Sequence, residues 1–361
     1  VVLGYAETAT ALGQCVAEAL GAPGLHSTRR PVAGLAPAGG FEEEHSHATS
    51  HLLLPRDPAL LRSPVPLVLV DDELSTGRTV MNTIAALQAR TPRERYVIAS
   101  LVDVRTEEAR AELHARAQAL GVRVDTVALV EGRVVTTDDT QARAASVLAG
   151  EALATGGALA TGGVSAPPRY AAPAPAVSRI TVPWPADLPE TARHGTSADD
   201  VRALDRLLPE LVEPLVATVR AARHTVHRVL VLGTEELMYA PLRLAAGLAD
   251  SLDADGDGTE VRFSTTTRSP VLVVDEPGYP IRSGITFPSH DDPADGPGPR
   301  FAYNVAGGGF DLVLVVTDAA GDTADLGAPG GLLSQLDAAE VALIALPTAH
   351  AHDHSHEGPP A

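Results

Sequence analysis

The run from Leu67 to Thr79 constrains this chain more than any other feature of its sequence. It reads LVLVDDELSTGRT: an apolar stretch, two adjacent carboxylates, then a turn of small hydroxyl residues and glycine that opens a helical pattern. The backbone N–H groups and hydroxyls of such a turn form a cradle for a phosphate dianion. The carboxylates suit a different partner, because they accept hydrogen bonds from a sugar diol and stabilise positive charge on a ribose ring. The run therefore predicts a site for a ribose 5-phosphate.

A second interpretation of this run stays open. A strand that ends in an aspartate-rich cap, followed by Ser and Thr as ordinary N-cap residues, would give the same letters without a ligand. The ligand interpretation is favoured because the strand, the acid pair and the S-T-G-x-T turn form one unbroken series. It assigns the sugar to Asp71 and Asp72. It assigns the phosphate to the turn residues Ser75, Thr76, Gly77, Arg78 and Thr79.

Alternating strand and helix patterns predict an α/β fold with a parallel sheet flanked by helices. The length of 361 residues favours two domains. We expect the first in residues 1–152, a Gly/Ala/Pro-rich linker in residues 153–196, and a second α/β domain in residues 197–348. Residues 349–361 form a histidine-rich tail, which we expect to be disordered rather than a metal site.

Composition and charge exclude several classes of function. All 27 cationic residues are arginine, so a Walker A loop and Schiff-base chemistry are excluded for want of a lysine. The formal charge of −19, without a basic stripe, argues against a nucleic-acid partner. The sequence shows neither an apolar run that could span a bilayer nor a signal peptide, so we expect no membrane association and a cytoplasmic location. The single Cys15 is interpreted as a buried thiol.

The rest of the ligand should be held at the end of a neighbouring strand, where ligands gather in open α/β sheets. The opening residues VVLGYAETATALG predict a strand, a turn and an Ala-rich helix. By itself such a turn is merely a helix cap, and it gains weight from sharing a domain with the run described above. The turn residues are Tyr5, Ala6, Glu7 and Thr8.

Two polar clusters follow at the ends of extended segments. In HSTRRP, Arg29 and Arg30 suit a pyrophosphate, because guanidinium groups bind phosphate oxygens bidentately and keep their charge. In FEEEHSHATSH, His45 and His47 share one face of a strand and are candidates for an acid, a base or a contact to the acceptor. A polar strand edge without such a role is the alternative. The loop over residues 31–43 between the clusters is expected to close over the site.

These motifs together resemble a known family. LVDDELSTGRT has the form of the pyrophosphate-sugar motif of the type I phosphoribosyltransferases. With VLGYAETATALG, HSTRR and EEEHSHATSH, it looks like the member found in bacterial tellurite-resistance and stress-response gene clusters, whose C-terminal domain is named for a T-R-S-P motif. That motif stands here at Thr267 to Pro270. The resemblance implies that Asp71 and Asp72 hold the ribose 2- and 3-hydroxyls, and that residues 5–9 form the pyrophosphate loop.

The second half of the chain repeats the order of motifs in the first. RVLVLGTEELMYAPLRLAAGL parallels VVLGYAETATALGQCVAEAL, FSTTTRSPV parallels LHSTRRPV, and DLVLVVTDAAGDT parallels PLVLVDDELSTGRT. Three matches in one order indicate a degenerate copy, although any two α/β domains share some of this pattern. Thr317 and Asp318 replace the acid pair, so we expect the copy to bind a sugar phosphate poorly. We expect Arg268 to bind another anion or to complete the first domain's site.

The sequence thus predicts a transferase that uses phosphoribosyl pyrophosphate and Mg²⁺, releases pyrophosphate and ribosylates a nucleobase-like or other heterocyclic acceptor in a stress-response pathway. Mg²⁺ binds phosphates and water with few protein ligands, so we expect no dedicated metal-binding cluster. A homodimer is one assembly that we consider. Two alternatives stay open: a regulatory protein that senses the same ligand without catalysis, and a structural partner in a stress-gene complex.

Overall fold

The computed structural model describes the chain apart from several segments. These are residues 33–34, 43–49, 147–176, 223, 255, 257, 292–297 and 349–361. His45, His47, the histidine-rich tail and most of the predicted linker therefore lie outside the described residues. Within the part that is described, no helix is long and apolar enough to cross a membrane.

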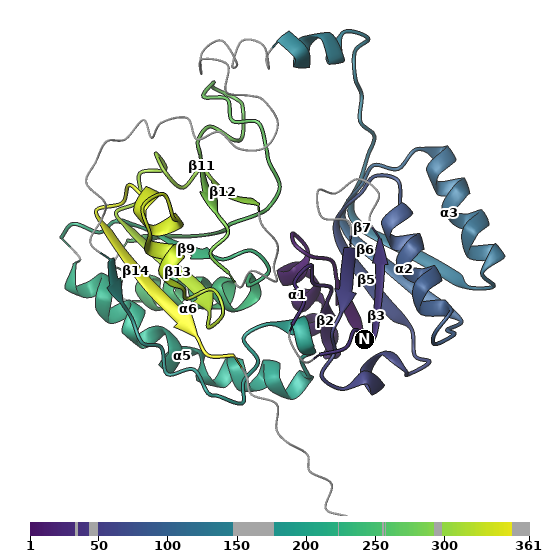
Figure 1. The fold of residues 1–361 in the computed structure, drawn as a ribbon, viewed down its shortest axis with the longest axis horizontal. Helices are drawn as coiled ribbons and strands as arrows, with labels where there is room; N and C mark the ends of the chain where they lie inside the picture. The colour runs from purple at the N-terminus through teal and green to yellow at the C-terminus, as the bar shows by residue number, and fades with distance from the viewer. Residues whose placement is uncertain are drawn as a thin grey trace, which may run out of the picture.

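The first half folds into a parallel sheet with helices on both faces (Figure 1). Across the sheet the strands are β2 (Gly24–His26), β1 (Val2–Gly4), β5 (Leu67–Leu74), β6 (Arg95–Asp103) and β7 (Arg123–Glu131). The other elements are α1 (Thr10–Leu20), the hairpin strands β3 (Gly39–Glu42) and β4 (Ser50–Leu53), η1 (Pro58–Leu61), α2 (Arg78–Gln88) and α3 (Glu107–Ala119). Because side chains alternate along a strand, Val2 and Val70 pack on α1, whereas Leu3 and Leu69 face α2 and α3.

The second half contains another five-stranded parallel sheet. Its strands, in spatial order, are β10 (Glu260–Thr265), β9 (Arg228–Gly233), β13 (Leu312–Asp318), β14 (Glu340–Leu346) and β8 (Val177–Arg179). Its helices are α5 (Ala198–Ala221) and α6 (Tyr239–Ala254), its hairpin strands β11 (Gly284–Pro288) and β12 (Pro299–Tyr303), and its 3-10 turns η2 (Ala192–His194), η4 (Ala324–Gly327) and η5 (Leu332–Gln335). One face packs on α5 and α6, and the other on the hairpin and η5. The predicted fold class, two α/β units with parallel sheets, is confirmed.

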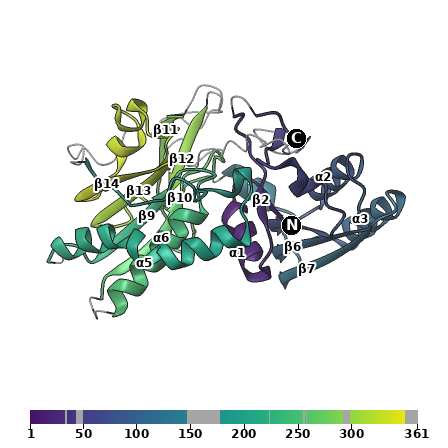
Figure 2. The same ribbon diagram turned by 90° about the horizontal axis from the view of Figure 1, so that it is seen from below.

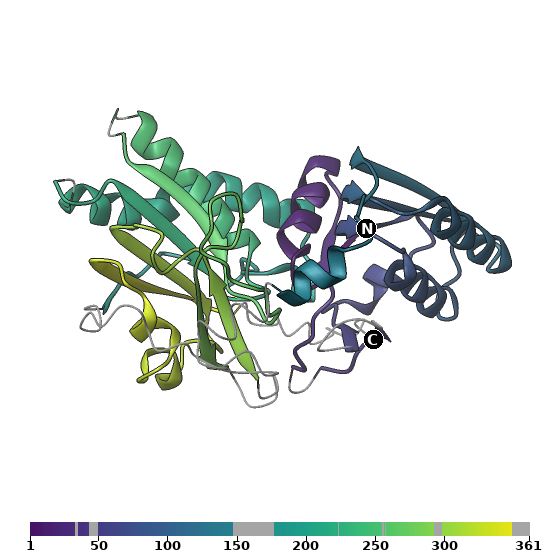
Figure 3. The same cartoon turned by 90° about the horizontal axis from the view of Figure 1, so that it is seen from above.

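The two sheets share one topology, which agrees with the predicted repeat. The order β2-β1-β5-β6 in the first sheet corresponds to β10-β9-β13-β14 in the second. Each half also has an antiparallel hairpin at the same place in the chain. The hairpin β3-β4 comes between β2 and β5, and the hairpin β11-β12 comes between β10 and β13. Seen from below, α1 lies between the first sheet and the helices α5 and α6 (Figure 2). From above, the two sheets form lobes on either side of this contact (Figure 3).

Residues 177–196, which composition assigned to the linker, are packed against both lobes. Strand β8 pairs in parallel with β14, and Trp184 is buried in the core of the second half with its indole N–H donating to Leu188 O at 3.0 Å. Thr196 then forms an antiparallel bridge to Gly24 on the edge strand β2 of the first half. The Pro-rich composition concealed this order, because the few apolar side chains that anchor the segment are spread thinly along it.

The histidine at the end of β2 joins the two halves. His26 is buried, and its Nδ1 lies 2.8 Å from Ser27 O, a carbonyl that can only accept. Its Nε2, 2.6 Å from Thr191 Oγ1, therefore accepts from that hydroxyl in the neutral ring. Burial lowers the pKa of His26 to about 4. Protonation would remove the acceptor that Thr191 uses and place a charge in the interface.

We predict that acid weakens this fold through His26. Its folded-state pKa, about 4, lies below the ordinary value of 6.5, so its contribution to stability is lost as the pH falls between these values. From pH 7 to pH 5 the free energy of unfolding should fall by about 2 kcal/mol, as measured by urea titration. His26→Gln should remove this part of the dependence, whereas His114→Gln on the exposed face of α3 should keep it. A wild-type stability that stays constant from pH 7 to 5 would contradict the assignment.

Helix α1 lies unusually close to β1 because two glycines face one another. A Cβ on Gly13 would lie 2.6 Å from the Cα and 2.9 Å from the N of Gly4. Both atoms belong to the backbone, so neither can move aside as a side chain would. This close approach brings the helix N-terminus up to the strand end where Tyr5 begins the predicted pyrophosphate loop.

We predict that Gly13→Ala destabilises the first half. The overlap with the backbone of Gly4 should cost about 2 kcal/mol, more than the helix propensity that alanine adds. Denaturant unfolding measures the loss. Gly132→Ala is the matched control, because a Cβ there meets nothing within 4 Å. Equal stability of the two variants would show that the close approach is unimportant.

Candidate functional site

The three predicted pieces of the ligand site meet at one edge of the first sheet. Gly4 at the end of β1 pairs with Val70 on β5 and with His26 on β2, so the carboxyl ends of these strands are adjacent. Tyr5 N then donates to Val70 O at 3.1 Å, directly before the acid pair. The structure thus brings together Tyr5 to Thr8, the residues after His26, and Asp71 with Asp72.

The acid pair lies within β5 rather than at its last residues. The strand continues through Glu73 to Leu74, which is buried, and both Asp71 and Asp72 are half-buried. Asp72 N donates to Asp71 Oδ1 at 3.1 Å. The strand is longer than predicted because Leu74 supplies one more apolar anchor beyond the acids. The carboxylates therefore sit on a regular strand, two residues before the turn.

The turn that follows has the conformation expected of a phosphate cradle. Gly77 adopts the left-handed region at φ 77° and is the N-cap of α2, which begins at Arg78. A glycine has no side chain to cap the helix, so the first amides of α2 are not satisfied by their own N-cap side chain. Ser75, Thr76 and Arg78 are exposed, and Arg78 N donates to Thr76 Oγ1 at 3.3 Å. The helix N-terminus is therefore open to an anion from solvent.

The predicted pyrophosphate loop is largely buried against the second half. Ala6 N donates to Ser27 Oγ at 3.0 Å, the peptide bond from Ala6 to Glu7 is cis, and Thr8 is exposed. The Glu7 carboxylate does not face the acid pair. Its Oε2 accepts from Thr267 Oγ1 at 2.9 Å and from Arg268 N at 3.1 Å, and its Oε1 lies 3.0 Å from Arg268 Nε. Glu7 thus ties this loop to the T-R-S-P motif.

Arg29 and Arg30 also turn toward the second half. Arg29 donates its backbone N–H to Glu236 Oε1 at 2.8 Å. The buried Arg30 guanidinium lies 3.2 Å from Asp318 Oδ2 and 3.5 Å from Asp291 Oδ2. Two carboxylates therefore already balance the charge of Arg30. The geometry assigns Arg30 to the contact between the halves rather than to the open turn of α2.

A small polar pocket lies where these contacts converge. It is lined by Arg30, Arg193, Thr234, Glu235, Glu236, Arg268, Asp291 and Asp318. Arg193 NH2 lies 3.2 Å from Glu236 Oε2, and Arg193 NH1 lies 3.5 Å from Asp318 Oδ2. Buried charges need such partners, because an unpaired ion in the interior is strongly unfavourable. The pocket is therefore an ion-pair network that the two halves build together.

The two glutamates at this boundary differ in their electrostatics. Burial raises the pKa of the Glu7 carboxyl, and the Glu235 carboxylate nearby raises it further. Burial would raise the pKa of Glu236 too, but the Arg193 guanidinium and the donors from Thr28 and Arg29 bring it to about 2. Glu236 therefore stays ionised at neutral pH. Glu7 depends more on the donors that the T-R-S-P motif provides.

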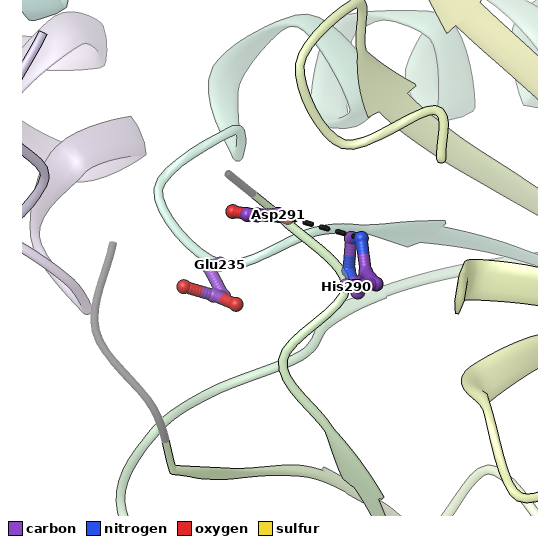
Figure 4. A group of neighbouring side chains, drawn as sticks. All are labelled: Glu235, His290 and Asp291. Atoms are coloured by element: carbon purple, nitrogen blue, oxygen red, sulfur yellow. Dashed lines mark ion pairs between the residues drawn. The ribbon is translucent and has the colours of Figure 1, made fainter. Parts of the chain in front are cut away.

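One cluster has the residue types of a metal site (Figure 4). Glu235, His290 and Asp291 place one ligand atom each within 4.8 Å of one another. However, Glu235 already pairs with Arg268 at 2.9 Å and with Arg300 at 2.5 Å, and Asp291 lies 3.0 Å from His290 Nδ1. Although burial lowers the pKa of His290, the Asp291 carboxylate raises it above its usual value. The guanidinium groups of Arg268 and Arg300 thus take the place of a metal cation beside Glu235.

Several members of this boundary were not predicted from the sequence. They are Arg193, His290, Asp291 and Arg300. The available signal was the cluster SHDD at 289–292, which follows β11 as the predicted EEEHSH cluster follows β3. Arg193 carried no signal, because it lies in a Pro-rich stretch that composition assigned to a linker.

Comparison with known proteins agrees with this division. Residues 1–133 match the family model described as phosphoribosyl transferase, and residues 190–336 match the model of the TRSP domain that lies C-terminal to it. No curated protein is significantly similar to the chain.

Among the solved structures that resemble the chain are three adenine phosphoribosyltransferases. The Trypanosoma brucei enzyme, solved with AMP, pyrophosphate and ribose 5-phosphate, is 14% identical over 40% of this chain and 67% of that one, at a TM-score of 0.26. The Thermoanaerobacter pseudethanolicus enzyme is 19% identical over 36% of this chain and 70% of its own, at a TM-score of 0.24. The Saccharomyces cerevisiae enzyme is 14% identical over 36% of this chain and 65% of its own, at a TM-score of 0.23. On the two family matches, residues 1–133 belong to the phosphoribosyl transferase family and residues 190–336 to the TRSP domain that follows it.

Proposed function

We propose that this chain is a phosphoribosyltransferase that binds phosphoribosyl pyrophosphate at the shared edge of β1, β2 and β5. The observation that carries the proposal is the turn around Gly77, in which Ser75, Thr76 and Arg78 are exposed. This turn opens α2 without a side-chain cap, begins two residues after the two carboxylates on β5, and follows a strand that pairs with β1. A phosphate group and a sugar diol on one ligand match this sequence of groups.

Each group has a defined part in the proposed reaction. The amides and hydroxyls of residues 75–79 hold the 5-phosphate, and the carboxylates of Asp71 and Asp72 accept from the ribose hydroxyls. The bond from C1 to the pyrophosphate oxygen breaks while a nitrogen of the acceptor forms a bond to C1. Positive charge grows on the ribose ring at this point, and the nearby carboxylates stabilise it. The acceptor is a nucleobase-like or other small heterocycle, and the product is a ribosylated heterocycle.

The acid pair also fits a bound Mg²⁺. Asp71 and Asp72 are half-buried, so they offer hard oxygen atoms while water still reaches them. Mg²⁺ would supply charge neutralisation on the pyrophosphate as it leaves. Arg29 remains the arginine we propose for the pyrophosphate, because Arg30 is balanced by Asp318 and Asp291. The roles of His45 and His47 stay a prediction, as do a cytoplasmic location, a homodimer and a stress-response role.

We predict that the acid pair is essential for turnover. Asp71→Asn and Asp72→Asn should each lower the rate of pyrophosphate release at least about a hundredfold, because the amide cannot stabilise the developing charge. The assay combines phosphoribosyl pyrophosphate, Mg²⁺ and a panel of nucleobases and small heterocycles. Asp125→Asn, which removes a carboxylate paired with Arg95 and Arg123 on the exposed β7, should behave as wild type. Equal loss in this control would point to general damage.

We predict that the conformation of Gly77 matters for the ligand and not only for the fold. Gly77→Ala should weaken binding of phosphoribosyl pyrophosphate about tenfold or more in calorimetry, because strain at positive φ shifts the amides of the turn. Gly121→Ala is the matched control: it also has positive φ, at 67°, but lies at the end of α3. Gly121→Ala should lose about 1 kcal/mol of stability, and Gly77→Ala somewhat more, because a Cβ there would lie 2.9 Å from Leu113 Cδ1 whereas one on Gly121 meets nothing within 4 Å. Unchanged affinity in Gly77→Ala would place the phosphate elsewhere.

A sensor that binds the same ligand without turnover is the second candidate. The observation that favours it is the pairing of Arg30 with Asp318 and Asp291, which leaves one arginine fewer for a departing pyrophosphate. Tight binding without pyrophosphate release, across the whole acceptor panel, would favour the sensor. Release with any acceptor would exclude it.

A further inference from the structure

The contact between the halves is reciprocal. Glu7 lies in the loop after β1 and accepts from the hydroxyl of Thr267, at 2.9 Å, and from the N–H of Arg268, at 3.1 Å. Glu236 lies in the loop after β9 and accepts from the hydroxyl of Thr28, at 2.6 Å, and from the N–H of Arg29, at 2.8 Å. In both cases the Thr-Arg pair follows the edge strand of the opposite sheet. Each half therefore offers one glutamate and receives one.

The loops that carry these glutamates are built alike. In the first half, Ala6 N donates to Ser27 Oγ at 3.0 Å. In the second, Glu235 N donates to Thr266 Oγ1 at 2.9 Å. Each donor precedes the glutamate by one residue, and each acceptor precedes the threonine by one residue. The hydrogen bond that joins each loop to its own edge strand is thus conserved between the halves.

The segments that carry the threonines correspond as well. Thr28 exchanges two backbone hydrogen bonds with Leu52 on β4, at 2.8 and 2.9 Å. Thr267 does the same with Phe301 on β12, also at 2.8 and 2.9 Å. Helices α1 and α6, which follow the two loops, pack on each other, and Tyr239 Oη donates to Glu18 Oε2 at 2.7 Å.

In a two-fold interface, each contact occurs twice, with the two partners exchanging roles. The reciprocal contacts of Glu7 and Glu236 have this form. We propose that the second half is a built-in partner subunit, and that Thr267 and Arg268 are positioning residues that hold the pyrophosphate loop of the first half through Glu7. The proposal rests on the proposed function for the identity of that loop. It names the T-R-S-P motif as a structural part of the first half's ligand site.

The pseudo-dimer is asymmetric at its ligand sites. In the second half, Gly321 N, in the turn that corresponds to the phosphate turn, donates to Asp318 Oδ1 at 2.8 Å. Asp318 also pairs with Arg30 and Arg193 from around the boundary. A carboxylate of the chain itself therefore occupies this turn, whereas Ser75, Thr76 and Arg78 in the corresponding turn of the first half are exposed. One half keeps the ligand site and the other supports it, so we expect one phosphoribosyl pyrophosphate per chain.

Hydrogen exchange on the full chain tests the positioning role directly. Thr267→Val removes one donor to Glu7 at constant side-chain shape, so amides of residues 5–9 should exchange about tenfold faster, while residues 234–238 stay unchanged. Thr28→Val should show the reverse pattern. Thr267→Ser keeps the hydroxyl and should restore wild-type exchange. Acceleration of both loops by either variant, or of neither loop, would overturn the proposal.

Ligand affinity supplies the second readout. Thr267→Val should raise the Kd for phosphoribosyl pyrophosphate with Mg²⁺ about tenfold, the effect of one hydrogen bond to a charged group. Tyr239→Phe is the control, because it removes a hydrogen bond between α1 and α6 without touching either loop. Equal losses in both variants, or two ligands bound per chain, would overturn the proposal. If wild type binds no ligand, the proposed function fails, and the exchange pattern still decides the positioning role.

Discussion

Two buried carboxylates at the boundary between the halves govern this structure. Glu7 is 5% exposed and Glu236 is 3% exposed, so neither can rely on water for its charge. A buried carboxylate needs several hydrogen-bond donors, and in both cases two of these donors, a threonine hydroxyl and an arginine backbone N–H, come from the opposite half. The two sheets must therefore stand at one relative position for either glutamate to be satisfied. The hydrogen bonds that these two buried carboxylates need, and not apolar contact alone, therefore fix the relative position of the halves.

The need of Glu7 for hydrogen-bond donors links the boundary between the halves to the proposed ligand site. Glu7 sits in the loop that begins where Tyr5 bonds to Val70, one residue before the acid pair on β5. Loss of a hydrogen bond from Thr267 or Arg268 to Glu7 would therefore disturb the loop at the carboxyl end of β1. The proposed ligand site is thus supported by a domain in which Asp318 already accepts from the corresponding turn.

Local patterns predicted most of the fold and the position of the turn that opens α2. The turn from Ser75 to Thr79 was predictable because strand, acids, glycine and helix stand in one short run, where backbone geometry follows from neighbouring residues. The repeat was predictable for the same reason. Arg30 shows the limit: its pattern matched a phosphate ligand, but its guanidinium is balanced by Asp318, far along the chain. Charge partners separated by such distances in sequence leave no local trace.

The degenerate turn shows how an aspartate at the same place can have a different role in each half. In the first half the residue at this place is Asp72, on a strand beside an exposed turn. Its counterpart Asp318 instead folds back to accept from Gly321 N and pairs with two arginines. A carboxylate in that place provides the negative charge that a phosphate would otherwise bring to the turn. In the second half this turn is therefore already paired with a carboxylate of the chain, which agrees with the proposed role of that half as a partner for the first.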